Sequence, residues 1–258
     1  MPRQTKHLKS LQRLLESEVS KRDNLCELSL ATPDPLMVAK THNDEVIALV
    51  CALFSYGNAK AIVNFLHTLD FSLLDASKER IEKELSNHRY RFQTPQDITS
   101  LFIALGRLKK ATTIEDIVFD GYSKRGDIFD GVSLLIEALY QIYPYSSSGY
   151  KFLIGKPYSK SSPFKRYMMY LRWMVRKDSL DMGLWTKIPI SELIMPLDVH
   201  TFSVSQKLGL LARKSYDQKA AIELTNTLRK FDKNDPVKYD FALYRIGQQE
   251  IIKNFLPK

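Results

Sequence analysis

Apolar side chains recur at intervals of three and four residues along almost the whole chain, which is the period of an amphipathic α-helix. Stripes of this kind run through residues 8–19, 46–54, 61–69, 98–108 and 132–139, and two further helices are expected over about 217–231 and 236–253. Alternating apolar and polar residues bounded by tight hairpin turns, the pattern of β-strands, are missing from the sequence. The pattern therefore predicts an all-α fold.

A helix is also predicted over residues 199–208, within the segment "PLDVHTFSVSQKLGL" at 196–210. Pro196 favours an extended approach to this helix, and Gly209 stands where a left-handed C-terminal cap is expected. Asp198 then falls at the N-cap, a position at which Asp is among the favoured residues. The simplest interpretation of Asp198 is that it only caps the helix.

The segment 145–178, "YSSSGYKFLIGKPYSKSSPFKRYMMYLRWMVRKD", reads as a short helix, a basic connection and a second helix. Ser162 is expected to cap the second helix and Pro163 to open it. The sequence predicts a buried stripe of Phe164, Met168, Leu171 and Val175, with charges of Lys165, Arg166, Arg172, Arg176 and Lys177 around it. The connection can hold a phosphate through backbone N–H groups, Ser hydroxyls and Lys, or it can be an ordinary solvated loop.

Two groups in these segments are suited to chemistry. Lys165 is expected near the third residue of its helix, where the helix dipole and the neighbouring Arg166 both favour a neutral, nucleophilic amine. At Asp198 the same kind of helix end favours the charged carboxylate. A neutral amine and a charged carboxylate make a suitable pair for attack at a sugar C1′, although Lys165 is equally compatible with a plain surface position.

The chain has 258 residues, a net charge of +9 and a pI near 9.3, which suits a polyanionic partner such as nucleic acid. It shows neither a membrane-length apolar run nor an apolar signal core, so a cytoplasmic protein is expected. Cys26 and Cys51 are far apart and form no metal-spaced cluster. We expect reduced thiols and no metal or cofactor.

The segment around Asp198 resembles the (V/L)-D-(T/V)-H-x-F-R-V-x-x-(R/K)-L-G-L segment of the helix–hairpin–helix DNA glycosylase superfamily. Asp198 matches the catalytic carboxylate of that motif, and its surroundings are matched by His200, Phe202, Val204, Leu208 and Gly209. The motif covers about fifteen residues directly, and the all-α layout extends the likeness over most of the chain. The resemblance implies two helical lobes that flank a DNA-binding cleft.

The sequence departs from the usual motifs of that superfamily in two respects. The segment "GKPYSKSSPFKR" at 155–166 replaces the usual L-P-G-V-G-type hairpin, and the gap before the Asp is longer, as in archaeal-type 8-oxoguanine glycosylases. The segments "KRYMMYLRWMVRKD" and "DPVKYDFALYRIGQ" also resemble a related bacterial family of uncharacterised proteins. Lys165 is then the match for the Schiff-base lysine, with Lys160 and Lys187 as alternatives. The four-cysteine iron–sulfur loop is missing.

The resemblance also implies where the flipped-out base is bound. In "YDFALYRIGQ" at 239–248, Asp240 would accept hydrogen bonds from the lesion, and Phe241 or Tyr244 would stack on it. Tyr56 and Asn58 are the candidates for filling the vacated base stack. Contacts to the DNA backbone are expected from Lys151, Lys156, Lys160, Arg166 and His200. Each of these residues also has a structural interpretation, in the core, in an ion pair or in a turn.

These expectations describe one helix–hairpin–helix domain of 258 residues, with lobe A at roughly 1–40 plus 191–258 and lobe B at roughly 41–190. The expected protein is a monomeric DNA repair glycosylase and AP lyase of base excision repair. It would excise an oxidised purine, 8-oxoguanine, from duplex DNA through a lysine Schiff base. Two alternatives stay open: a monofunctional glycosylase for alkylated bases that uses only the Asp, and a non-catalytic DNA-binding helical protein.

Overall fold

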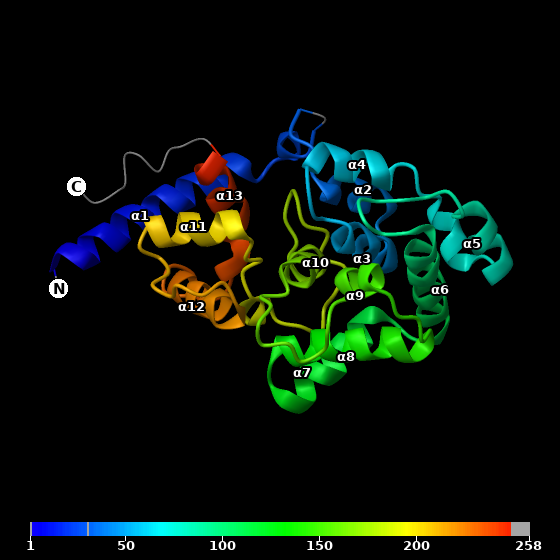
Figure 1. Cartoon of the computed structure of the whole chain (residues 1–258). Coiled ribbons are helices and arrows are strands. Elements are labelled where there is room, and N and C mark those ends of the chain that lie inside the picture. The colour runs from blue at the N-terminus through cyan, green and yellow to red at the C-terminus, as the bar shows by residue number, and fades with distance from the viewer. Residues whose placement is uncertain (1, 30, 249–258) are drawn as a thin grey trace. The chain divides into compact units, whose positions relative to one another are not determined.

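The computed structural model describes residues 2–29 and 31–248 (Figure 1). Over these residues the chain forms thirteen α-helices joined by turns and short 3-10 segments, and it contains no β-strand. Two isolated bridges, Tyr90 with Gln93 and Lys177 with Met182, are the β-type pairings of the described part. The all-α fold predicted from the apolar period is thereby confirmed.

The chain folds as two compact units, unit 1 from Met1–Ser29 with Lys160–Lys258 and unit 2 from Leu30–Ser159. These boundaries differ from the expected ones, at which the chain passes from lobe A to lobe B near residue 40 and returns to lobe A near residue 190. Helix α2 (Pro35–His42) packs against α3 (Glu45–Leu53), so it belongs to unit 2. Helix α10 (Lys165–Val175) belongs to unit 1, where its Arg172 forms an ion pair with Asp240. As a result Lys165 and Asp198 lie in the same unit.

Unit 1 contains α10, whose side chains are largely buried. Its other helices are α1 (Pro2–Arg22), α11 (Val199–Lys207), α12 (Gln218–Leu228) and α13 (Asp240–Gln248), with 3-10 turns η1 (Leu25–Glu27), η3 (Ile190–Glu192) and η4 (Pro236–Tyr239). The stripe of α10 predicted from the sequence, from Phe164 to Val175, is buried, which confirms it. Helix α13 packs against both α1 and α11 (Figure 1), and its first residue is Asp240.

Unit 2 contains the helices from α2 to α9. After α2 and α3 these are α4 (Ala59–Leu66), α5 (Lys78–Glu84), α6 (Pro95–Ala111), α7 (Ile114–Arg125), α8 (Ile128–Ile142) and α9 (Ser148–Ile154), with the 3-10 turn η2 (Phe71–Asp75) before α5. Helices α7 and α8 lie side by side (Figure 1). A Cβ on Gly131 of α8 would lie 2.4 Å from the carbonyl oxygen of Val118, so this close approach requires glycine.

Candidate functional site

Lys165 stands at the very start of α10. Phe164 occupies the N-cap in a left-handed conformation, with φ of 49°, and Lys165 is the first helical residue rather than the third. The predicted cap at Ser162 is wrong. Its hydroxyl accepts a hydrogen bond from the backbone N–H of Phe164, 3.1 Å away, and so closes a local turn ahead of the helix. The helix therefore begins without a side-chain cap, and a cationic residue occupies its first position.

The amine of Lys165 is half-buried and poorly paired. Its Nζ lies 3.4 Å from Sδ of Met169, one turn along α10, and a thioether is only a weak acceptor. Among residues 2–29 and 31–248 no carboxylate forms an ion pair with Lys165. An amine placed in this way keeps its lone pair available whenever it loses its proton.

Asp198 is the N-cap of α11, as the sequence predicts. One carboxylate oxygen, Oδ1, accepts a hydrogen bond of 2.7 Å from the backbone N–H of Thr201. The preceding Leu197 is fixed by the hydroxyl of Tyr216, which donates to its carbonyl oxygen at 2.8 Å. Burial, together with the negative charge of Asp198, raises the pKa of Tyr216 to about 12. The carboxylate is thus held by the helix end on one side and lies near a tyrosine hydroxyl on the other.

Asp240 is the first residue of α13, and Oδ2 of its largely buried carboxylate accepts a hydrogen bond from the Arg172 guanidinium. Arg172 itself is buried, and its Nε donates to Asp181 at 3.2 Å. In the described part of the chain no residue donates a hydrogen bond to Oδ1 of Asp240. One oxygen is therefore committed to Arg172, and the other can still accept a hydrogen bond from a ligand.

The pKa of Asp240 depends on the charges of Lys165 and Asp198. Burial raises the pKa of Asp240 to about 6, while the positive charges of Arg172 and Lys165 oppose that rise and the negative charge of Asp198 adds to it. The charges of Lys165 and Asp198 therefore both act on the Asp240 carboxylate. The N-termini of α10, α11 and α13 thus supply one lysine and two aspartates to one site in unit 1.

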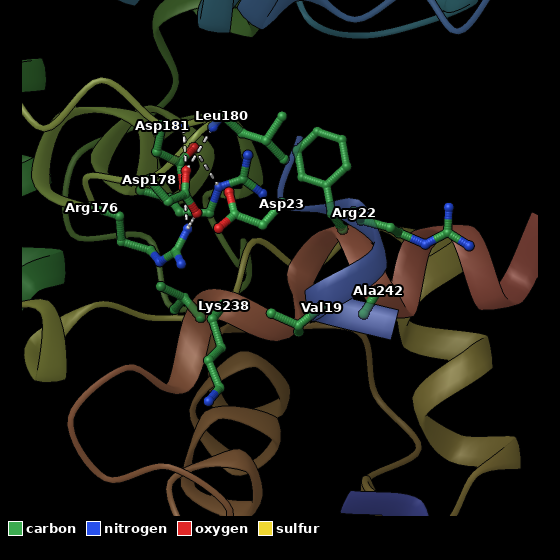
Figure 2. Close-up of a pocket in the computed structure, with 12 residues that line it drawn as sticks. Val19, Arg22, Asp23, Arg176, Asp178, Leu180, Asp181, Lys238 and Ala242 are labelled. Atoms are coloured by element: carbon green, nitrogen blue, oxygen red, sulfur yellow. Dashed lines mark hydrogen bonds and ion pairs between the residues drawn. The ribbon is translucent and has the colours of Figure 1, made fainter. Parts of the chain in front are cut away.

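Arg172 and Asp181 belong to a larger network of buried and half-buried ion pairs. Arg176 donates to Asp181 at 2.5 Å, to Asp178 at 2.6 Å and to Asp235 at 2.9 Å, and it shares Asp181 with Arg172. Figure 2 shows Arg176, Asp178 and Asp181 turned toward one another at the edge of a cavity of about 20 Å³. That cavity holds about one water molecule, so it is too small for a nucleobase. The network fixes Arg172 and through it Asp240.

The two aromatic residues expected to stack on a base have partners of their own. The Phe241 ring lies under the Arg172 guanidinium, whose carbon is 4.8 Å from the ring centroid. Tyr244 packs edge-to-face against His200, with ring centroids 6.0 Å apart, and the Arg245 guanidinium lies 5.6 Å from its centroid. Tyr244 and His200 therefore belong to the packing of α13 on α11.

The remaining predicted residues fall into both units. Tyr56, Asn58, Lys151 and Lys156 lie in unit 2, whereas Lys160 lies in unit 1, with the half-buried Arg166 and the exposed Lys187. The amide oxygen of Asn58 caps α4 by accepting from the N–H groups of Lys60 and Ala61, at 3.0 and 3.2 Å. Of the three lysine candidates, the charge of Lys165 is the one that acts on Asp240. The structure thus brings together Lys165, Asp198 and Asp240.

Some kinds of site are not found in the described residues. No group of three or more His, Cys, Asp or Glu in residues 2–29 and 31–248 is arranged to hold a metal ion. In the same residues no helix has the length and apolar character needed to cross a membrane. The two cysteines are free thiols, Cys26 exposed and Cys51 fully buried.

Sequence reasoning missed Arg172, Asp181 and Tyr216. Arg172 was expected among the charges around the stripe of α10, but it is 3% exposed. The signal was present, because one Arg stands inside the apolar run "YMMYLRWMV", and a charge at a core position needs a buried partner. The identity of that partner had no local signal, because Asp181 and Asp240 lie 9 and 68 residues further along the chain.

The structure defines an all-helical protein of two units with a lysine–aspartate site in unit 1. Its family follows from a family model that matches residues 34–249, most of the chain, and that is described as "Protein of unknown function (DUF2400)". The chain belongs to this DUF2400 family. No curated protein and no solved structure matches the chain.

The predicted membership of the helix–hairpin–helix DNA glycosylase superfamily is therefore wrong, because the matching family model is DUF2400. The resemblance depended on about fifteen residues around Asp198. Much of that segment serves the local start and end of α11: Asp198 caps it, and Gly209 follows it with φ of 74°. Any short helix with the same caps would share these features, so they do not define a superfamily.

Proposed function

We propose that the protein is a DNA glycosylase with AP lyase activity, in which Lys165 is the nucleophile and Asp198 stabilises positive charge on the sugar. The observation that supports the proposal best is that the charges of Lys165 and Asp198 both act on Asp240. A half-buried lysine without an ion pair and a carboxylate fixed by a helix N-terminus are the groups that amine attack on an electrophilic carbon requires.

The reaction follows from these roles. Nζ of Lys165 forms a bond to C1′ of the damaged nucleotide while the bond from C1′ to the base breaks, and the electron pair leaves with the base. The carboxylate of Asp198 stabilises the positive charge that develops at C1′. A proton passes from the amine to O4′ as the C1′–O4′ bond breaks, which gives a ring-opened Schiff base. Removal of a 2′ proton from its protonated form then breaks the bond from C3′ to the 3′ phosphate, which leaves with the electron pair.

As the substrate we propose an oxidised purine, with 8-oxoguanine as the first candidate. Oxidation at C8 turns N7 of guanine from an acceptor into an N–H donor. Oδ1 of Asp240 accepts no hydrogen bond from the described residues, and the charge of Arg172 keeps the carboxylate in place. A fixed carboxylate oxygen is a suitable acceptor for that N–H group.

The direct test is incision of a panel of duplexes, each with one lesion: 8-oxoguanine, an alkylated purine, uracil or an abasic site. We expect cleavage of the 8-oxoguanine strand, and with borohydride a covalent protein–DNA adduct. Release of an alkylated base without an adduct would replace the proposal with a monofunctional glycosylase. Binding to every duplex without release of any base would leave a non-catalytic DNA-binding protein.

Lysines near the connection between α9 and α10 are expected to hold DNA phosphates. Changing Lys156 and Lys160, both exposed, to Gln should weaken binding to damaged and undamaged duplexes alike. The slope of log K against log salt should fall by about one unit for each phosphate group that the variant no longer neutralises. Fluorescence anisotropy at several salt concentrations measures this, with the exposed pair Lys230 and Lys233 changed to Gln as a control. Weaker binding to lesion-containing DNA alone would contradict the phosphate role.

The titration of Asp240 predicts an acid limb in the pH profile. Because its pKa is raised to about 6, the carboxylate is ionised above this pH and protonated below it. Single-turnover excision should therefore be about tenfold slower at pH 5 than on the plateau above pH 7. In Asp240→Asn the plateau should be lower and this limb absent, since Asn does not titrate. A wild-type profile that stays flat from pH 5 to pH 7 would remove Asp240 from the reaction.

A further inference from the structure

Unit 2 carries a cluster of aromatic side chains on its surface, which we call the aromatic patch: Tyr56, Phe92 and Phe152, with Arg91 beside them. Phe92 is 51% exposed and Phe152 is 44% exposed. The two phenylalanine rings meet edge-to-face at 4.7 Å, and Tyr56 lies 4.9 Å from Phe152 and 5.9 Å from Phe92 between centroids. Three rings from three separate segments thus form one exposed apolar surface.

The buried side chain of Gln93 holds the aromatic patch in place through hydrogen bonds. Its Oε1 accepts a hydrogen bond from the Tyr56 hydroxyl, and its Nε2 donates to the carbonyl oxygen of Gly149 at 3.2 Å. The Tyr90 hydroxyl donates to the Tyr56 carbonyl oxygen at 2.7 Å. A buried amide therefore joins the segments that carry Tyr56, Phe92 and Phe152, and the exposed rings project from a fixed base.

The turn that carries Phe92 has an unusual backbone. The N–H of Gln93 donates to the carbonyl oxygen of Tyr90 at 2.9 Å, and Arg91 between them is left-handed, with φ of 55°. Its guanidinium carbon lies 5.8 Å from the Tyr56 ring centroid. A Cβ on Gly57 would lie 2.8 Å from Nη1 of Arg91, so glycine leaves room for the cation. The turn thus places a positive charge at the edge of the rings.

The positive charges around the aromatic patch favour a negatively charged binding partner. The segments 54–60, 86–94 and 147–156, which build it, contain no Asp or Glu but five cations, all exposed: Lys60, Arg89, Arg91, Lys151 and Lys156. Because all the charges of these segments are positive, they repel a second copy of the chain, whose net charge is +9. Exposed rings between cations match a strand whose bases stack and whose phosphates are negative.

We propose that the aromatic patch is a base-stacking platform that binds unpaired nucleotides of a DNA strand. Phe92 and Phe152 provide the stacking surfaces, and Arg91 and Lys151 neutralise the adjoining phosphates. This inference does not depend on the site around Lys165, because the aromatic patch lies entirely in unit 2.

The test compares two fluorescein-labelled strands of equal length, an oligothymidylate and a sugar-phosphate strand without bases, each titrated with the full chain. The wild-type protein should bind the oligothymidylate about a hundredfold more tightly, with about tenfold for each of two bases stacked on Phe92 and Phe152. Phe92→Ala and Phe152→Ala should each remove about tenfold of affinity for the oligothymidylate and leave binding to the base-free strand unchanged.

Two substitutions distinguish stacking from a general apolar contact. Phe92→Trp should keep the affinity, whereas Phe92→Leu, which keeps apolar volume without a π face, should behave like Phe92→Ala. Tyr158→Ala serves as the control, because Tyr158 is a 40% exposed aromatic of unit 2 that is not part of the aromatic patch. Thermal melts check that each variant is folded.

Three results would overturn the proposal. The first is that Phe92→Ala or Phe152→Ala weakens binding to both strands equally, and the second is that Phe92→Leu binds as tightly as the wild-type protein. The third is a dimer in sedimentation that Phe92→Ala dissociates. The readout is the affinity for each strand, so it requires neither base excision nor a covalent adduct. Failure of the stacking platform is therefore distinguishable from failure of the proposed glycosylase activity.

Discussion

Lys165→Gln should abolish the covalent adduct that borohydride traps between the protein and DNA containing 8-oxoguanine. An imine needs a primary amine, and a Gln side chain has none. Base excision should also fall on the order of 10²-fold or more, because the bond to C1′ can no longer form. The measurement is a denaturing gel of the trapped adduct, together with single-turnover excision.

The fold and the DNA affinity should survive this substitution. Lys165 is half-buried and its Nζ is paired only weakly, with the Met169 thioether, so the free energy of unfolding should change by about 0.5 kcal/mol. Lys160→Gln and Lys187→Gln are the matched controls, because both lysines are exposed and lie in unit 1. A normal adduct with Lys165→Gln and none with one of the controls would transfer the role to that lysine.

Asp198→Asn separates capping from catalysis. Asn caps a helix about as well as Asp, so the hydrogen bond from the Thr201 N–H is kept. The loss of the charge at the helix N-terminus should cost at most about 1 kcal/mol of stability. Base excision should fall on the order of 10²-fold, because a fixed negative charge no longer faces the developing cation. Lesion binding should persist.

Single-turnover excision and thermal melts on the same preparation measure both effects. Asp127→Asn is the matched control, since Asp127 caps α8 of unit 2 through the N–H of Phe129 at 2.9 Å. It should change stability by a similar amount without changing excision. If Asp198→Asn excises at the wild-type rate, Asp198 is a helix cap only, and the proposed reaction loses its stabilising charge.

The sequence by itself determined the local structure. The period of apolar residues predicted the all-α fold because each helix must turn one face toward a core. It also predicted the buried stripe of α10, the cap at Asp198 and the left-handed Gly209, since each of these depends on residues within one or two turns of a helix. The start of α10 was misplaced because the Ser162 hydroxyl had two competing uses, a cap and a turn.

Only the tertiary structure decided which side chains form the site. Asp240 was expected either to bind a base or to form an ion pair, and the structure pairs it with the buried Arg172, 68 residues before it in the chain. The aromatic patch joins residues 56, 92 and 152, and none of the three segments predicts the other two. Such pairings depend on how whole helices pack, and burial then sets the charge of the groups they enclose. A periodicity of three or four residues carries no information about contacts at these separations.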